Sequence, residues 1–265
     1  MAENRYVFDN AAKAETGLRF AGLEATFDPS TIGYLTGVGV TAGWACWEIG
    51  AGGGSIARWL AERVGPTGRV LATDIDPRFI PPSQLSHLEV ARHDVCADAI
   101  PLARYDLIHA RLVLSHLPER RDVVVRLVQA LRPGGWLVIE DFCHAFERGT
   151  EPPSPADAEL RTVVLALARF MERATGNEWD FATSLPQSLA GLGLADVGGE
   201  GRLVFGRGGS PVAGVIEAAL RQVGDQMIAT GLVDRPALDE AIVFLTTPAS
   251  MVSLPLMVSA WGRQK

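Results

Sequence analysis

The sequence predicts an α/β protein whose core is a mostly parallel β-sheet. Three observations support this prediction: strand-like and helical segments alternate between residues 44 and 140, a glycine-rich turn follows the first strand, and an acid ends the second. Strands that alternate with helices form parallel sheets with right-handed crossovers. The 265 residues, of which 48% are hydrophobic, suit one large domain with a cap better than two independent domains.

The segment before this alternation is predicted to form two helices. Residues 10–27 carry apolar side chains at helical spacing. Asp28, Pro29 and Ser30 then indicate a turn, which can cap a second short helix around residues 32–35.

Five strands and two helices are predicted in the alternating segment. Short apolar runs indicate strands at 44–49, 69–73, 88–92, 105–108 and 136–140. Apolar positions three and four residues apart indicate helices at 55–64 and 123–131. Glycine and proline follow both helices, as is typical of helix ends.

The alternation stops after Phe142. A proline-rich linker at 151–155 is followed by patterns that predict helices at 156–175, 184–192 and 212–230, and strands at 201–206 and 251–261. The apolar stretch 241–260 is interrupted by threonine, serine and proline, so it predicts buried strands rather than a membrane span. We expect an N-terminal helical cap at 1–40 and a main domain at 41–265, with cap insertions at about 143–183 and 207–249.

Charge and cysteine content narrow the classes of partner. The formal net charge of −7 and the lack of a long basic run disfavour a nucleic acid partner, because phosphate binding needs clustered Lys and Arg. Three widely spaced cysteines give neither a disulfide framework nor zinc-ligand spacing. No signal-peptide pattern occurs at the N-terminus, so the cytoplasm is the expected location.

The most informative segment is residues 48–55, EIGAGGGS, which leaves a strand and enters a helix. Glycines let the backbone approach a ligand and adopt positive φ, and the helix N-terminus adds a partial positive charge. A phosphate-binding P-loop would need Gly-Lys-Ser/Thr, which is absent. A dinucleotide fingerprint would need glycine or alanine at position 55, where Ser55 stands. A plain strand-to-helix turn is the remaining structural alternative.

The pattern acid-x-Gly-x-Gly-x-Gly resembles the first motif of Rossmann-like methyltransferases that use S-adenosylmethionine (SAM). Asp74 stands where that family has its ribose-binding acid, and Asp94 matches the family's adenine-binding acid. Residues 105–118 resemble the fourth motif, and residues 131–140 resemble the "LRPGG" turn with the fifth strand. The resemblance covers the first 142 residues. The chain resembles bacterial methyltransferases of the ubiquinone-biosynthesis type, especially those that tailor secondary metabolites.

The resemblance implies a seven-stranded mixed sheet with helices on both faces and a helical substrate cap. It implies SAM as cofactor, S-adenosylhomocysteine (SAH) as its product, and a small organic molecule as methyl acceptor on oxygen, nitrogen or carbon. The residues that it assigns to the cofactor follow its motifs: Glu48, Gly50, Ala51, Gly52, Asp74, Ile75, Asp94, Val95 and His109. Of these, Glu48 would orient the cofactor's ammonium group, and His109 would touch its methionine part.

Two side chains at the end of the fifth strand are candidates for a catalytic base, Asp141 and His144. Alignment of the reactants without a base is the alternative. Metal-dependent relatives carry an acid after the fourth strand, where this chain has His109-Ala110-Arg111, so no metal is expected. Two other functions stay open: a SAM-binding protein without methyl transfer, and a nicotinamide-dependent oxidoreductase. The sequence does not identify the methyl acceptor. It also leaves the oligomeric state open, and a homo-oligomer is one of the alternatives.

Overall fold

The computed structural model describes Phe8 and residues 13–144, 154–176 and 180–265, and these residues group into two compact units. The sheet unit consists of Phe27–Asp141, Ala182–Gly201 and Val258–Lys265. The helical unit consists of the described residues within Met1–Thr26, Phe142–Phe181 and Arg202–Met257. Parts of the expected cap segments, 1–7, 9–12, 145–153 and 177–179, lie outside the described residues. The assignment of the cap stays a prediction.

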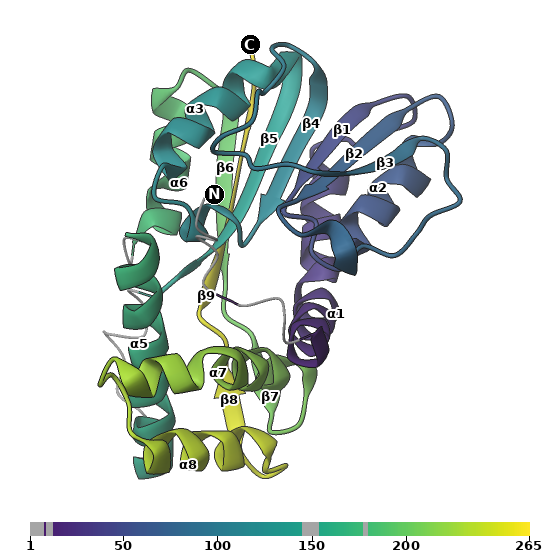
Figure 1. Cartoon of the computed structure of the whole chain (residues 1–265). Helices are drawn as coiled ribbons and strands as arrows, with labels where there is room; N and C mark the ends of the chain where they lie inside the picture. The colour runs from purple at the N-terminus through teal and green to yellow at the C-terminus, as the bar shows by residue number, and fades with distance from the viewer. Residues whose placement is uncertain (1–7, 9–12, 145–153, 177–179) are drawn as a thin grey trace. The chain divides into compact units, whose positions relative to one another are not determined.

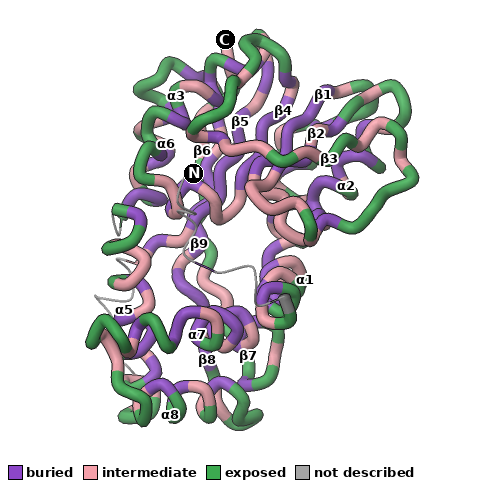
Figure 2. Tube along the Cα trace, viewed as in Figure 1, coloured by how far each residue is buried: buried purple, intermediate pink, exposed green. Residues whose placement is uncertain are grey.

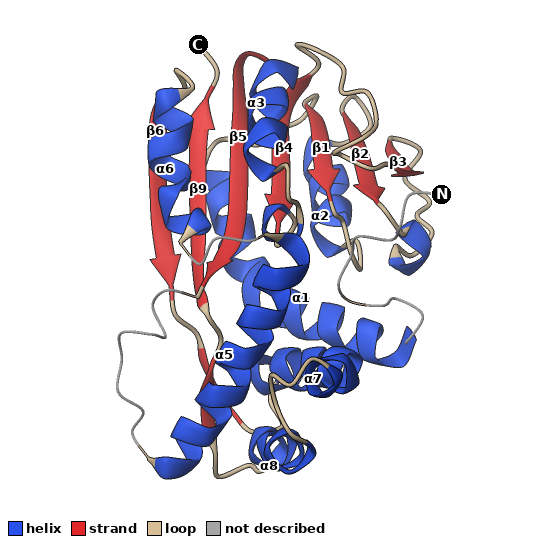
Figure 3. Ribbon diagram, turned by 60° about the vertical axis from the view of Figure 1, so that its left-hand side comes forward, coloured by secondary structure: helices blue, strands red, loops and turns tan. Residues whose placement is uncertain are grey.

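The sheet unit is built on seven strands in the order β3-β2-β1-β4-β5-β9-β6. Their bounds are β1 Ala45–Ile49, β2 Arg69–Asp74, β3 Leu88–Arg92, β4 Tyr105–Arg111, β5 Leu131–Cys143, β6 Ala195–Arg202 and β9 Leu256–Arg263. The five strands β1 to β5 pair in parallel. The end of β9 meets the start of β5, where the Gly134 amide donates to the Gln264 carbonyl at 2.9 Å, so β9 runs antiparallel (Figure 3). The predicted seven-stranded mixed sheet is confirmed.

Helices cover both faces of this sheet (Figure 3). One face carries α2 (Ser55–Val64) and the second half of α1 (Lys13–Gly37), and the other carries α3 (Arg120–Ala130) and α6 (Phe181–Gly191). Apolar side chains of α1, α2 and the central strands form one buried cluster, which includes Leu35, Cys46, Leu60, Leu107 and Val138. Figure 2 shows β1, β4 and β5 buried along most of their length, which gives the site below a rigid base.

The turn predicted at Asp28–Pro29–Ser30 is wrong, because α1 runs unbroken through Pro29. Proline lacks an N–H, so one helical hydrogen bond is lost there. Tertiary contacts compensate: Phe27 and Leu35 are completely buried on either side of it. Asp28 and Thr31 also accept hydrogen bonds from Arg111 in β4, at 2.8 and 2.9 Å.

Two predictions for the C-terminal third are wrong. The strand expected at 201–206 is split between β6 and the short β7 (Phe205–Arg207), and residues 241–246 belong to helix α8 (Arg235–Thr246). The glycines of β6 hide its strand pattern, but they permit close packing: a Cβ on Gly198 would lie 2.7 Å from the Trp261 ring. The fifth strand also begins earlier than predicted, at Leu131, within the LRPGG sequence.

The helical unit contains α5 (Pro155–Thr175), α7 (Pro211–Ala229), α8, the hairpin of β7 with β8 (Met251–Ser253), and the first half of α1 (Figure 1). Close backbone approaches hold it together, since a Cβ on Gly224 of α7 would lie 2.6 Å from Leu238 of α8. Gln222 of α7 bonds Thr16 and Arg19 of α1 at 2.7 and 3.0 Å. Within the described ranges, no helix is both long enough and apolar enough to cross a membrane.

Candidate cofactor site

The glycine turn between β1 and α2 has a backbone that side chains rarely adopt. Gly50, Gly52 and Gly54 have φ of 63°, 55° and 82°, in the left-handed region that favours glycine. A Cβ on Gly50 would also lie 2.3 Å from Cγ2 of Val113, in the loop after β4. The turn is therefore packed closely against the carboxyl end of β4, and the backbone amides at the start of α2 lie beside it.

Asp74 ties this turn to the end of β2. Its Oδ2 accepts a hydrogen bond from the Gly52 amide at 3.0 Å, and its Oδ1 accepts one from the Asp76 amide at 2.9 Å. Burial raises the pKa of Asp74, and these two amide bonds partly oppose the rise. The carboxylate is thus held by the backbone, with lone pairs left on both oxygens for further donors. Ile75 follows it and is half-buried.

Asp94 and Val95 begin the loop after β3, beside the end of β2. The His93 amide donates to the Asp74 carbonyl at 3.0 Å, which joins the two strand ends. The Asp94 carboxylate accepts from the Cys96 amide at 2.9 Å. Arg126 of α3 donates to the carbonyls of Val95, Cys96 and Asp98, at 3.0, 2.9 and 2.6 Å respectively. This arginine was missed by the sequence analysis.

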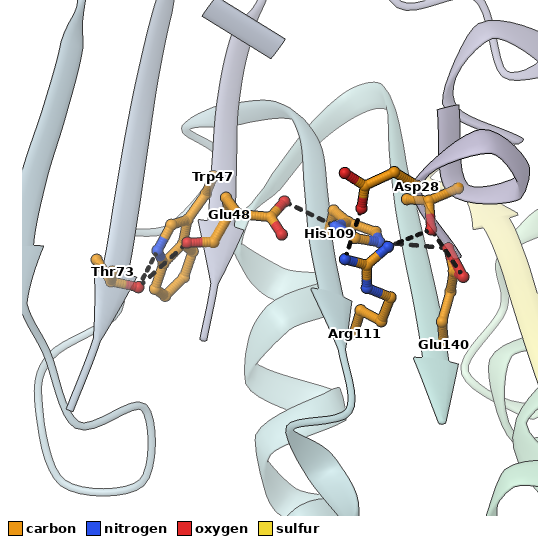
Figure 4. A network of polar contacts seen from close by, with 8 residues as sticks. Asp28, Trp47, Glu48, Thr73, His109, Arg111 and Glu140 are labelled. Carbon is orange, nitrogen blue, oxygen red and sulfur yellow. Dashed lines mark hydrogen bonds and ion pairs between the residues drawn. The ribbon is translucent and has the colours of Figure 1, made fainter. Parts of the chain in front are cut away.

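Glu48, His109 and Glu140 meet on the α1 face of the sheet (Figure 4). Glu48 pairs in register with His109, and Arg111 pairs with Glu140. Since side chains two apart on a strand share a face, all four side chains lie on one side of three adjacent strands. Nδ1 of His109 lies 2.7 Å from Oε2 of Glu48, and Nε2 lies 3.5 Å from Oε1 of Glu140.

This cluster is buried and is completed from α1. The Thr31 hydroxyl donates to Oε2 of Glu140 at 3.1 Å and accepts from Arg111. The His109 side chain has no exposed surface, and about 5% of the Glu48 side chain is exposed. In this arrangement His109 has no surface to offer a cofactor, whereas Glu48 lies two residues before Gly50 and keeps some. Contact between His109 and a cofactor stays a prediction that this geometry does not support.

The two candidate bases have different surroundings. Asp141 is completely buried in β5, and its Oδ2 accepts from the Ser115 amide at 2.8 Å, so it holds the loop after β4. His144 follows β5 in the helical unit, and burial lowers its pKa to about 4. Its imidazole is therefore neutral at pH 7, the form that can accept a proton. Neither role as a base is tested by this geometry.

The sequence analysis missed the charged partners of the predicted residues. Asp28, Thr31, Arg111 and Glu140 were not assigned to the site, although Arg111 and Glu140 stand in apolar strands where charged side chains are rarely buried without a partner. That mismatch was a usable signal. Among the described residues, no group of three or more His, Cys, Asp or Glu side chains is arranged to hold a metal ion.

Comparison with known proteins gives the same family for these residues. Residues 47–137, which contain the glycine turn and β2 to β4, match the family model of a methyltransferase domain. Methyltransferase str2 of Strobilurus tenacellus is 34% identical over 158 residues, 57% of this chain and 53% of that protein. Ubiquinone biosynthesis O-methyltransferase of Leptothrix cholodnii is 29% identical over 117 residues, 41% of this chain and 46% of that protein. The chain therefore spans about half the length of these relatives.

Solved structures share the fold. A methyltransferase of Bacillus halodurans has a TM-score of 0.56 at 16% identity, covering 89% of this chain and 99% of that chain. Phosphoethanolamine N-methyltransferase 2 of Haemonchus contortus, solved with SAM, has a TM-score of 0.56 at 14% identity, covering 94% of this chain and 57% of that chain. Identities this low concern the fold alone. Residues 47–137 therefore match a methyltransferase domain, and the mixed seven-stranded sheet has the fold of these solved methyltransferases.

Proposed function

We propose that this chain uses SAM to methylate a small organic molecule. The observation that carries the proposal is the bond between the Gly52 amide and Asp74, which joins the glycine turn to an acid at the carboxyl ends of adjacent parallel strands. Ligands of open α/β sheets bind outside these strand ends. The turn lies within the matched methyltransferase domain, and that match gives no support to a nicotinamide-dependent reaction.

The residues present fit the chemical groups of SAM. Asp74 is a fixed carboxylate with free lone pairs, suited to a ribose diol. The loop of Asp94 and Val95, held by Arg126, would take the adenine. Gly50, Ala51 and Gly52 would lie against the methionine part, and Glu48 would accept a hydrogen bond from its ammonium. Ile75 would pack beside the ribose. Each of these assignments is part of the proposal.

The protein's contribution to the reaction would be alignment and exclusion of water. SAM, when bound, supplies a methyl group on a sulfonium that is already a strong electrophile. The chain therefore has to hold the acceptor in line with that methyl and keep water away. Asp141 or His144 would accept a proton only if the acceptor's nucleophile carries one. Asp141 already accepts a hydrogen bond from the Ser115 amide, so His144 is the candidate that we test first.

The acceptor class follows from the relatives and from the charge. Two of the relatives named above carry methyltransferase and ubiquinone-biosynthesis names, which favours a small organic acceptor such as a secondary metabolite. The net charge of −7 argues against a nucleic acid acceptor. The expected cap at 1–40, 143–183 and 207–249 would cover such an acceptor during the reaction.

The test combines binding with a search for product. Calorimetry should detect SAM and SAH binding to the wild type, and Asp74→Ala should weaken both by about 1.5–3 kcal/mol, the range for a hydrogen bond to a charged group. Asp122→Ala, an exposed acid in the first turn of α3, is the matched control and should bind normally. The protein is then incubated with SAM and a metabolite extract of the source organism. Formation of SAH together with a product heavier by one methyl supports the proposal, and a wild type that binds neither SAM nor SAH refutes it.

A further inference from the structure

The cluster around His109 has an arrangement that the proposed methyl transfer does not by itself require. An imidazole lies between two carboxylates, with Nδ1 facing Glu48 and Nε2 facing Glu140. All three side chains are in the interior of the sheet unit: His109 and Glu140 have no exposed surface, and Glu48 has almost none. Burying three ionisable groups is unfavourable unless they compensate one another.

The groups that face His109 come from both neighbouring strands. Glu48 of β1 is on one side and Glu140 of β5 on the other, while α1 adds Thr31, which bonds Glu140, and Asp28, which pairs with Arg111. Burial alone would lower the pKa of His109, but the two carboxylates outweigh burial and raise the pKa to about 9. At pH 7 the ring is therefore an imidazolium with a hydrogen on each nitrogen, and Nδ1 donates its hydrogen to Glu48.

The two contacts of this imidazolium are unequal. The bond to Glu48 is short, at 2.7 Å, whereas the 3.5 Å to Glu140 is ion-pair distance and too long for a strong hydrogen bond. Glu140 is fixed independently by the Thr31 hydroxyl at 3.1 Å. His109 therefore orients Glu48 most strongly, and Glu140 orients His109.

The net charge of Glu48, His109 and Glu140 indicates which kind of ligand this cluster favours. Two carboxylates and one imidazolium leave one formal negative charge, since Arg111 is compensated by Asp28 at 2.8 Å. His109 occupies Oε2 of Glu48, so its other oxygen can accept from a further donor. A cationic donor at that oxygen would balance the charge of the cluster. The ammonium of SAM or SAH is such a group.

We propose that His109 is a positioning residue for cofactor binding, which acts through Glu48 and fixes that carboxylate for the cofactor's ammonium. Glu140 of β5 faces the other side of the His109 ring, and Glu140 is itself held by Thr31 of α1, which accepts from Arg111 of β4. The inference rests on the proposed function, because it concerns the same cofactor. It assigns His109 to support of Glu48 in place of direct contact with the methionine part.

Two uncharged amides at position 109 separate this role from simple packing. Asparagine places its amide at the δ position, where it can still donate to Glu48, whereas glutamine places its amide one atom farther along, toward Glu140. The affinity of each variant is measured by calorimetry for SAH and for 5′-methylthioadenosine, which has the adenine, ribose and sulfur of SAH but no ammonium. Leu127→Ala, which opens the buried side of α3 away from this cluster, is the control for loss of stability.

The expected result is a split between the two ligands. His109→Gln should weaken SAH binding about 10- to 100-fold, by analogy with the loss of residues that orient metal ligands. His109→Asn should weaken it less, and neither variant nor Leu127→Ala should change the affinity for 5′-methylthioadenosine. Equal losses for both ligands, or no loss for SAH, would overturn the role of His109 while SAM binding by the wild type stands. A wild type that binds neither ligand would refute the proposed function, and this inference with it. If His109→Gln does not fold, Thr31→Val gives the same split in weaker form, and its absence overturns the role.

Discussion

Replacing Gly50 with alanine tests how closely the glycine turn packs, because the structure predicts the loss in the free energy of unfolding. Gly50 has φ of 63°, and a Cβ there would lie 2.3 Å from Cγ2 of Val113. A left-handed backbone costs an L-residue about 1–2 kcal/mol. Overpacking a close contact adds about 1–3 kcal/mol. Gly50→Ala should therefore lower the free energy of unfolding by roughly 2–5 kcal/mol, as the sum of the two terms.

A second glycine isolates the backbone part of that cost. Gly176, at the end of α5, has φ of 61°, and a Cβ there would meet no atom of the described residues within 4 Å. Gly176→Ala should therefore lose only the backbone part, about 1–2 kcal/mol. The midpoint of thermal unfolding measures both variants, at about 2–4 °C per kcal/mol for a chain of this size.

A double variant tests whether the contact with Val113 causes the additional loss of stability. Val113→Ala in the Gly50→Ala background removes the clashing methyl and should restore part of the lost stability. Equal midpoints for Gly50→Ala and Gly176→Ala would refute the close packing of the turn against Val113. A double variant less stable than Gly50→Ala alone would refute it as well.

Four further predictions follow from the charges and the chain organisation. The raised pKa of His109 stabilises the folded state below the unfolded pKa of about 6.5, and this stabilisation is lost as the pH rises through about 9. Between pH 6 and 10 the unfolding midpoint of the wild type should therefore fall by the equivalent of roughly 3 kcal/mol, and that of His109→Asn should fall much less. If His144 is the base, His144→Ala should lower turnover with unchanged SAM affinity, and wild-type turnover should fall only as the pH drops toward about 4. Unchanged turnover of His144→Ala would transfer the role to Asp141 or to alignment alone. Turnover should survive EDTA, and activity abolished by EDTA and restored by magnesium would contradict metal independence. Deleting residues 1–25 removes the bonds of Thr16 and Arg19 to α7 but leaves Asp28 and Thr31 in place. Circular dichroism should therefore show a folded sheet, while turnover falls strongly. Full activity would show that the cap is misplaced.

The sequence by itself determined the elements whose information is local. Residues 55–64 show the apolar spacing of a helix and end at Gly65, and the structure has α2 at these residues. The strand predicted at 88–92 coincides with β3, and the glycine turn lies between β1 and α2 as expected. In each case the apolar period and the flanking glycines agree with one conformation, so little is left for distant contacts to decide.

The pattern was insufficient where distant contacts outweigh local preference. A proline at position 29 indicates a break, yet buried apolar contacts and the bonds from Arg111 keep α1 continuous. The glycine-rich β6 has a weak strand pattern, and it is held in the sheet by close packing of Gly198 on Trp261. Residues 241–246 show an apolar run that fits a strand or a buried helix equally, and packing in the helical unit selects α8.

The candidate site also has a part that the sequence predicts and a part that only the tertiary structure decides. The sequence identified Glu48, Asp74 and Asp94 because their motifs are short and continuous along the chain. It could not place Glu48, His109 and Glu140 against one another, since the register of three parallel strands and the position of α1 are set by packing of the whole sheet unit. The charge on His109 depends on that register, because only the two carboxylates brought to either side of the ring outweigh the effect of burial.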